Sequence, residues 1–267
     1  MPEIAEVETV RRILKKKILN KQIIDVNISY EKMIENDINY FKKVLINNTF
    51  KDILRKGKYL IFELKEHYLI SHLRMEGKYF CESLPNNSKH THVIFKLSDN
   101  TYLSYNDVRK FGKMKIIEKT DLERYFKKLG KEPKDLNLDY LKNKISKSNK
   151  NIKTILLDQS IIAGLGNIYA NEVLFASLIN PKKIGKNLTD EEISKIIQTS
   201  IEIVNLAIKN GGTTIKSYTS SLNQKGSYQK FLKVHMKENK HCCNCNSIII
   251  KEKINGRSTY YCESCQK

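Results

Sequence analysis

The feature that most constrains this chain is the crowding of five of its six cysteines into the last 26 residues. Cys242 and Cys245 are separated by two residues, as are Cys262 and Cys265, and sixteen residues lie between the pairs. A secreted disulfide framework would distribute its cysteines along the chain. This spacing predicts one structural zinc ion held by four thiolates. A pair of redox-active C-x-x-C motifs is the alternative, and Cys243 is a spare thiol that breaks the spacing.

The segment between the cysteine pairs predicts a β-hairpin, with strands near 247–253 and 258–261 and a turn at Asn255-Gly256. A module of this size cannot form a substantial core alone, so the metal is expected to hold it together. Arg257 follows the turn, where it is placed either to bind phosphate or to lie as a solvated turn residue.

The formal net charge of +19 over 267 residues points to a polyanionic partner, nucleic acid first. Part of the excess could be compositional drift toward Lys, Asn and Ile. Only seven of the 48 basic residues are arginine, and Arg74, Arg109 and Arg257 lie in segments that contain glycine or aromatic residues. No uncharged apolar run approaches the length of a membrane span, so we expect a soluble intracellular protein without a membrane partner.

Residues 22–118 contain several short alternating segments that predict strands and hence a β-sandwich or barrel. Examples are the segments 22–30, 58–64, 68–72, 92–97 and 101–105. Beyond residue 119 the pattern becomes helical, which predicts a second domain with helices near 151–158, 168–177 and 189–210. Gly164-Leu165-Gly166-Asn167 precedes the second of these helices and could cradle an anion, or Asn167 could simply be the N-cap.

The chain opens MPEIAEVETV, which raises a question about Pro2 and Glu3. A signal peptide would need a cationic start and an apolar core. The plain interpretation is a helix with Pro2 in its first turn and acids facing the positive end of the dipole. Local pattern favours that interpretation on its own.

Several motifs nevertheless occur together: the N-terminal Pro-Glu, SHLRMEG at 71–77, NDVRKFG at 106–112, GLGNIYANEVLF at 164–175, GGTTIKSY at 211–218 and GRSTYYC-x2-CQK at 256–267. Nearly end to end, the chain closely resembles the formamidopyrimidine-DNA glycosylases, bacterial repair enzymes for oxidised purines. The resemblance implies an α+β multidomain fold. Its parts are an N-terminal β-sandwich with flanking helices at 1–118, a helix–two-turn–helix domain at 132–222 and a four-cysteine zinc hairpin at 238–267.

The resemblance also implies the chemistry. With Met1 removed, the amine of Pro2 is the nucleophile that forms a Schiff base with the sugar, and Glu3 carries the proton that opens the sugar ring. Lys58 is implied as a phosphate contact and proton donor in β-elimination. Arg257 is implied as the corresponding group in δ-elimination.

DNA contacts follow from the same resemblance. His72, His90 and Asn167 are implied to contact DNA, and Met75, Arg109 and Phe111 match the residues that fill the gap left by a flipped nucleotide. Read alone, Met75 and Phe111 would be core residues. The lesion-capping loop corresponds to Thr213, Thr214, Ile215, Lys216, Ser217 and Tyr218. The implied partner is double-stranded DNA with oxidised purines or abasic sites, bound by a cytoplasmic monomer.

Two positions depart from the family pattern: Ala5 stands where a second proline is common, and Ser148 stands where a lysine contacts DNA, with Lys147 and Lys150 nearby. The capping-loop segment SSLNQKGSYQ also departs from the family pattern. One alternative is an endonuclease VIII-like glycosylase for oxidised pyrimidines, which shares Pro2, Glu3 and the zinc module. Another is a non-catalytic zinc-containing nucleic-acid-binding protein, which leaves Pro2-Glu3 unexplained.

Overall fold

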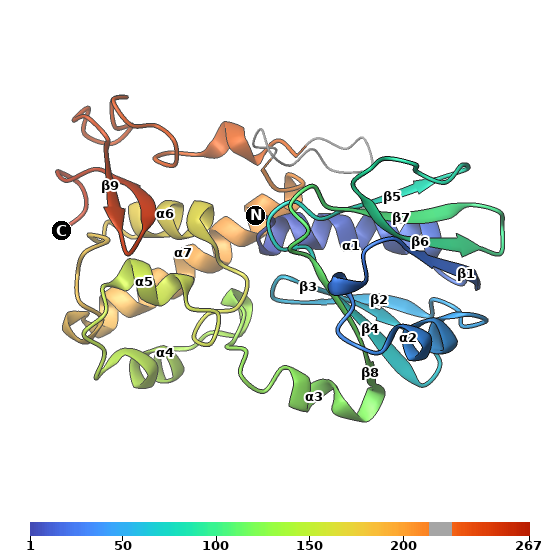
Figure 1. The fold of residues 1–267 in the computed structure, drawn as a ribbon. Helices are drawn as coiled ribbons and strands as arrows, with labels where there is room; N and C mark the ends of the chain where they lie inside the picture. Colours follow the sequence, from blue (N-terminus) through green and yellow to red (C-terminus); the bar gives the residue numbers. More distant parts are fainter. Residues whose placement is uncertain (214–225) are drawn as a thin grey trace. The chain divides into compact units, whose positions relative to one another are not determined.

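The computed structural model describes residues 1–213 and 226–267, which form two compact units (Figure 1). The first unit contains residues 1–127 and the described residues of 211–226. The second contains residues 128–210 and 227–267. Within the described ranges, every helix is too short or too polar to cross a bilayer.

The first unit begins with helix α1 (Ile4–Ile18), which buries one apolar face. Val7, Val10, Leu14 and Ile18 recur at helical spacing and are at most 1% exposed. Glu3 is the N-cap, so Pro2 lies just outside the helix. The plain interpretation of Pro2 as a first-turn residue is therefore wrong, because the helix begins two residues later.

Two four-stranded antiparallel sheets follow α1 and form the predicted β-sandwich (Figure 1). One sheet has the order β1-β6-β7-β5, with strands Ile23–Ile28, Thr91–Leu97, Tyr102–Asn106 and Lys78–Glu82. The other has the order β2-β3-β4-β8, with strands Asp52–Lys56, Tyr59–Glu63, His67–His72 and Lys113–Glu118. The flanking helices are α2 (Ile38–Leu45) and α3 (Leu122–Tyr125).

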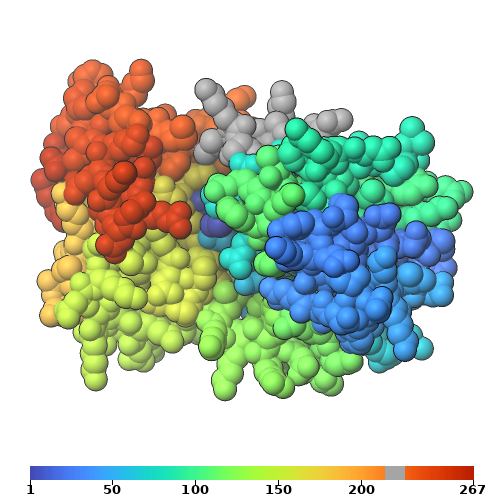
Figure 2. Space-filling model, viewed as in Figure 1, coloured from blue at the N-terminus to red at the C-terminus, as the bar shows by residue number. Residues whose placement is uncertain are grey.

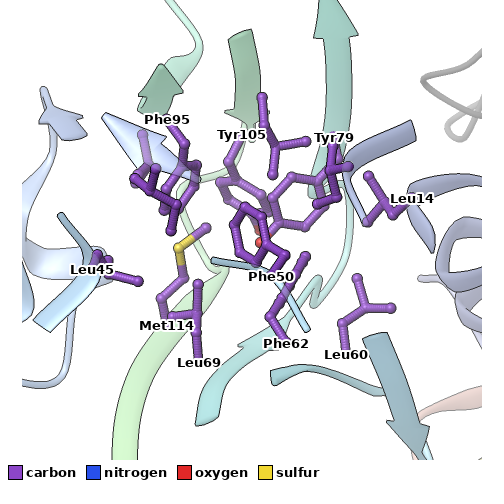
Figure 3. Packing of buried hydrophobic residues seen from close by; sticks show 14 of the residues in the cluster. Leu14, Leu45, Phe50, Leu60, Phe62, Leu69, Tyr79, Phe95, Tyr105 and Met114 are labelled. Carbon is purple, nitrogen blue, oxygen red and sulfur yellow. The ribbon is translucent and has the colours of Figure 1, made fainter. Parts of the chain in front are cut away.

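The core of this unit lies between the two sheets and α1 and is rich in aromatic rings (Figure 3). Three pairs of rings are in contact, with centroid separations of 5.5 Å for Phe50 and Phe62, 5.6 Å for Phe62 and Tyr79, and 5.0 Å for Tyr79 and Tyr105. Their tilted and edge-on contacts are the geometries that aromatic pairs favour. The chain of rings therefore joins the inner faces of both sheets.

Four α-helices and a hairpin make up the second unit. They are α4 (Leu138–Ile145), α5 (Ile152–Leu157), α6 (Asn167–Ala176), α7 (Asp190–Lys209), β9 (Ile250–Ile254) and β10 (Arg257–Tyr261). Helix α7 starts at the predicted capping box of Thr189 and Glu192. Among the described residues, short 3-10 turns occur at Glu31–Met33 and Lys119–Asp121 in the first unit and at Pro133–Asp135, Gly185–Asn187 and Tyr228–Phe231 in the second.

The hairpin β9–β10 has the predicted turn, in which Asn255 (φ 46°) and Gly256 (φ 72°) are both left-handed. Two consecutive positive φ angles match the type I′ turn that asparagine-glycine favours. The hairpin packs against α6 through a small core that includes Phe175, Ile249 and Tyr260. In the space-filling view, the red C-terminal segment lies against the yellow residues of the same unit (Figure 2). The hydrogen bond from Asn255 Nδ2 to Thr154 Oγ1, 2.6 Å long, agrees with this placement.

Candidate active site and metal centre

The start of the chain brings two buried carboxylates together. Glu3 and Glu6 are 2% and 4% exposed, and the backbone N–H of Glu3 donates to Glu6 Oε2 at 2.9 Å. The other oxygen of Glu6 accepts from both the backbone N–H (2.7 Å) and the hydroxyl (2.9 Å) of Thr213. One carboxylate thus ties the first residues of the chain to the stem of the predicted lesion-capping loop.

The N-terminal amine lies in a charged and partly desolvated environment. Burial lowers the pKa of the Met1 amine, while the carboxylates of Glu3, Glu6 and Glu76 raise it and Lys58 lowers it. Lys58 is itself only 5% exposed and lies in the turn between β2 and β3. An amine with a lowered pKa is a free base for a larger share of the time at neutral pH. The amine therefore lies within electrostatic reach of three carboxylates and one lysine.

His72 ends β4 and is held in the neutral state. Its Nδ1 accepts the backbone N–H of Arg74 at 2.9 Å, and its ring contacts Tyr59 edge-on with centroids 4.5 Å apart. Burial, with smaller contributions from Arg74 and Lys58, lowers the pKa of His72 to about 3. With Nδ1 occupied as an acceptor, the proton of the neutral ring is on Nε2. That nitrogen is a hydrogen-bond donor without a charge.

Two loops at one end of the sandwich carry the predicted gap-filling residues. We call residues 73–77 the methionine loop and residues 107–112 the arginine loop. Met75 is partly exposed in the first, and Arg109 and Phe111 are exposed in the second, where the guanidinium lies 4.8 Å from the centre of the Phe111 ring. Neither Met75 nor Phe111 is a core residue.

His90 contributes its backbone to this region, because its carbonyl accepts the N–H of Asp107 at 2.9 Å. Its side chain is partly exposed. Of the predicted capping loop, only Thr213 is described. Thr214, Ile215, Lys216, Ser217 and Tyr218 lie outside the described residues.

In the second unit, Asn167 is the first residue of α6, and Gly166 is the N-cap. The simple N-cap interpretation of Asn167 is therefore wrong. Its Nδ2 donates to the carbonyl of Ser258 at 2.9 Å, so the start of α6 is joined to the hairpin beside Arg257. Arg257 is exposed. The structure thus brings together two predicted phosphate contacts that are 90 residues apart in the sequence.

A buried polar network supports this arrangement. Lys153 is completely buried, and its Nζ donates to the carbonyl of Asn167 at 3.3 Å and to Asn171 Oδ1. Asn171 Nδ2 lies 2.7 Å from His235 Nδ1. The neighbouring Glu172 carboxylate accepts backbone N–H groups from residues 233, 234 and 235 at 2.8 to 3.1 Å. Helix α6 therefore anchors the segment that leads to the hairpin.

This network makes stability depend on pH. Since Asn171 accepts from Lys153, its amide nitrogen donates to His235 Nδ1, which requires a neutral ring. Burial, followed by the charge of Lys153, lowers the pKa of His235 to about 4 from an ordinary 6.5. Between pH 4 and pH 6.5, His235 is protonated in the unfolded chain but neutral in the folded chain. The contribution of neutral His235 to the free energy of unfolding is therefore fully present above pH 6.5 and is lost as the pH falls to about 4.

We expect the unfolding free energy to decrease by up to about 1.4 kcal/mol per pH unit in this window through His235 alone. His235→Asn keeps an acceptor for Asn171 and removes the titration. Denaturant unfolding at several pH values should give a shallower decline for this variant than for the native chain. Parallel declines would contradict the assignment.

The sulfur atoms of Cys242, Cys245, Cys262 and Cys265 all lie within 4.8 Å of one another, and no other such group of three or more His, Cys, Asp or Glu occurs in residues 1–213 and 226–267. Sγ of Cys242 and Cys265 are 3.8 Å apart, and those of Cys245 and Cys262 are 3.4 Å apart. A tetrahedron with bonds of about 2.3 Å has edges of about 3.8 Å. The four cysteines could therefore hold a metal. Cys243 is exposed and contacts Asn244 instead.

Sequence reasoning missed several residues that build these sites. Glu6 was identifiable from its position three residues after Glu3, as in a capping box. Asp107 lies within NDVRKFG, but its complete burial has no local signal. Lys153 and Glu76 also lack a local sequence signal, because a lysine or glutamate in a polar segment is normally solvated.

Comparison with known proteins gives a consistent result. Residues 1–114 match the family described as the formamidopyrimidine-DNA glycosylase N-terminal domain, and residues 129–219 match the formamidopyrimidine-DNA glycosylase H2TH domain. The formamidopyrimidine-DNA glycosylase of Streptococcus mutans is 45% identical over 273 residues, covering 100% of both chains.

Solved structures of the Lactococcus lactis enzyme Fpg are similar throughout. Its complex with DNA that contains N7-benzyl-Fapy-dG has a TM-score of 0.94 at 42% identity and covers 100% of both chains. Its complex with DNA that contains an abasic site has a TM-score of 0.94 at 42% identity and covers 99% of both chains.

Proposed function

Because this chain belongs to the formamidopyrimidine-DNA glycosylase family, we propose that it removes oxidised purines from double-stranded DNA and then cuts the strand. Family membership makes it a DNA glycosylase that acts in base-excision repair. The substrates proposed are 8-oxoguanine and formamidopyrimidines, and the second activity is that of an abasic-site lyase. The observation that carries this proposal is the N-terminal amine, partly desolvated among Glu3, Glu6 and Lys58.

The first step uses the amine of Pro2 after Met1 is removed. The nitrogen attacks C1′ of the sugar, the glycosidic electron pair leaves with the base, and the proton that the amine loses balances the proton that the base gains. Glu3 supplies a proton to the ring oxygen as the sugar opens. Once the amine has lost its proton, the nitrogen carries three carbon substituents and no N–H, so its lone pair forms a cationic iminium as the ring opens. The environment that lowers the pKa of the Met1 amine supports a free-base nucleophile there.

The iminium then serves as an electron sink for strand cleavage. Loss of a C2′ proton expels the 3′ phosphate in β-elimination, and a second elimination expels the 5′ phosphate. We assign Lys58 to proton donation on the 3′ side. Arg257 has the corresponding role in δ-elimination and binds phosphate as well. A lysine near an amine nucleophile and an exposed arginine on a rigid hairpin suit these roles.

DNA binding is proposed to combine backbone and base contacts. His72 and Asn167 contact phosphates, His90 gives a further contact, and Met75, Arg109 and Phe111 fill the gap left by the flipped nucleotide. The loop from Thr213 to Tyr218 caps the lesion. The proposal also includes three domains, at 1–118, 132–222 and 238–267. The protein is further proposed to be a monomer and to be located in the cytoplasm.

The metal proposed for the four cysteines is zinc, bound as a closed structural site without an open position for chemistry. Such an ion would hold the hairpin that carries Arg257.

Borohydride trapping tests the proposal, because an iminium can be reduced to a stable amine link. Protein with a verified Pro2 terminus is expected to form a covalent adduct with a duplex that contains 8-oxoguanine opposite cytosine. Pro2→Gly, which changes the secondary amine, and protein that retains Met1 serve as controls, and the retained methionine should prevent trapping. A second duplex with thymine glycol opposite adenine distinguishes the pyrimidine-specific alternative. Correctly trimmed protein that never becomes attached to either duplex would refute the proposed chemistry.

A further inference from the structure

We propose that the hydroxyl of Tyr105 is a positioning group that sets the spacing between the methionine loop and the arginine loop. The inference rests on the proposed function, in which these loops place Met75, Arg109 and Phe111 into the duplex. Tyr105 contacts no DNA in this proposal. It acts by making the two loops one rigid piece.

The topology places the two loops side by side. Both connect the two sheets of the sandwich: the methionine loop runs from β4 to β5, and the arginine loop runs from β7 to β8. The strands that flank the loops are paired with one another. Strand β4 pairs with β8, where His72 lies opposite Lys113, and β5 pairs with β7, where Lys78 lies opposite Asn106. The loops therefore leave and enter the sheets at neighbouring positions.

Each loop ends in a buried glycine, and Tyr105 explains both. A Cβ added to Gly77 would lie 2.1 Å from the Tyr105 oxygen, and one added to Gly112 would lie 1.9 Å from it. Neither glycine has the left-handed φ that would itself call for glycine. The space taken by one hydroxyl is thus a reason for glycine at both positions, with the Leu73 carbonyl also close to Gly77.

Each loop is also closed within itself. Gly77 N–H donates to the Leu73 carbonyl at 2.9 Å. In the arginine loop, the buried carboxylate of Asp107 accepts the N–H of Arg109 at 3.1 Å and that of Gly112 at 2.7 Å. Two internally closed loops that touch the same oxygen have little freedom to move separately.

Tyr105 is well placed to act as a spacer, because its own position is set by the core. It is completely buried in β7, and its ring contacts that of Tyr79 with centroids 5.0 Å apart (Figure 3). Tyr79 offers a matched comparison. Its hydroxyl donates to Ser71 Oγ at 2.8 Å, and the three atoms nearest to an added Cβ at either glycine do not include any atom of Tyr79.

The test compares Tyr105→Phe with Tyr79→Phe, since each variant removes one buried hydroxyl and keeps the ring. Single-turnover rates are measured for excision of 8-oxoguanine from a duplex and for cleavage of an abasic site in single-stranded DNA. The second substrate has no opposite strand and needs no gap to be filled. We expect Tyr105→Phe to lower the first rate about tenfold relative to the second. Tyr79→Phe should leave the ratio at its native value.

A ratio that is equal in the two variants would overturn the inference, whatever their thermal stabilities. Gly112→Ala gives an independent measurement, because it should lower the ratio of the duplex excision rate to the single-strand cleavage rate. Adding Tyr105→Phe should lower this ratio by a smaller factor in the Gly112→Ala variant than in the native chain. If the two substitutions lowered the ratio by independent factors that multiply, the result would also contradict the role of Tyr105 as a spacer. If the native enzyme itself neither excises nor cleaves, the proposed function fails, which is a distinct result.

Discussion

Glu3→Gln is expected to slow excision of 8-oxoguanine by about 10²–10⁴-fold, the usual range for loss of a general acid or base. Glutamine has the same shape and can still lie at the N-cap of α1, but it cannot transfer a proton. Cleavage at a preformed abasic site should be affected much less, because its sugar already exchanges with the open-chain aldehyde. Single-turnover assays on the two substrates measure the difference.

Glu8→Gln is the matched control for this variant. Glu8 is also a buried carboxylate of α1, but it binds Arg11 and Arg12 at 2.8 Å and Arg55 at 3.2 Å. The charges with the largest effects on the pKa of the Met1 amine belong to other residues: Glu3, Glu6, Lys58 and Glu76. We expect this control to be less stable and to excise at a nearly native rate. Equal slowing by both substitutions would attribute the effect to disruption of α1 and would remove Glu3 from the proposed mechanism.

Local patterns predicted much of the fold. The asparagine-glycine turn, the capping box at Thr189 and the spacing of the cysteines each depend on residues close in sequence, and all three occur in the structure. The predicted sandwich is also confirmed. Strands β2, β5 and β8 lie in the region predicted to be mostly strands but were not located individually, and helix α2 was not predicted. The β8 segment KMKIIE carries three charges in six residues, and its place is set by pairing with β4, about 45 residues earlier.

The site was harder to predict than the fold. The resemblance indicated Pro2, Glu3 and Arg257 as site residues, and their roles stay predictions. It did not indicate the supporting hydrogen bonds within the site regions. Examples are the one that Glu6 accepts from Thr213 and the one that Lys153 donates to the carbonyl of Asn167. These contacts join residues 207 and 14 positions apart. Burial of a charged side chain depends on partners that the tertiary fold supplies, so no local pattern distinguishes Lys153 from a solvated lysine.

Removal of the metal should have the second large effect, since a structural zinc ion typically contributes about 10–16 kcal/mol to the folding of a small module. The hairpin core includes only a few apolar residues, among them Ile249 and Tyr260. Treatment with a chelator, or Cys262→Ser, is expected to unfold β9 and β10 while the sandwich stays folded. Hydrogen exchange of residues 240–265 should then rise to the rate of an unfolded chain.

DNA binding should weaken at the same time, because the unfolded hairpin no longer presents Arg257 beside Asn167. Loss of one charge-assisted contact of about 1.5–3 kcal/mol corresponds to a decrease of about 10- to 150-fold in affinity. Cys243→Ser is the control, since its thiol lies outside the cluster, and it should bind metal and DNA normally. Native affinity in the metal-free protein would show that the hairpin takes no part in DNA binding. Loss of metal in the control would show that the set of ligands is wrong. The two results separate the role of the hairpin from the identity of the cysteines that hold it.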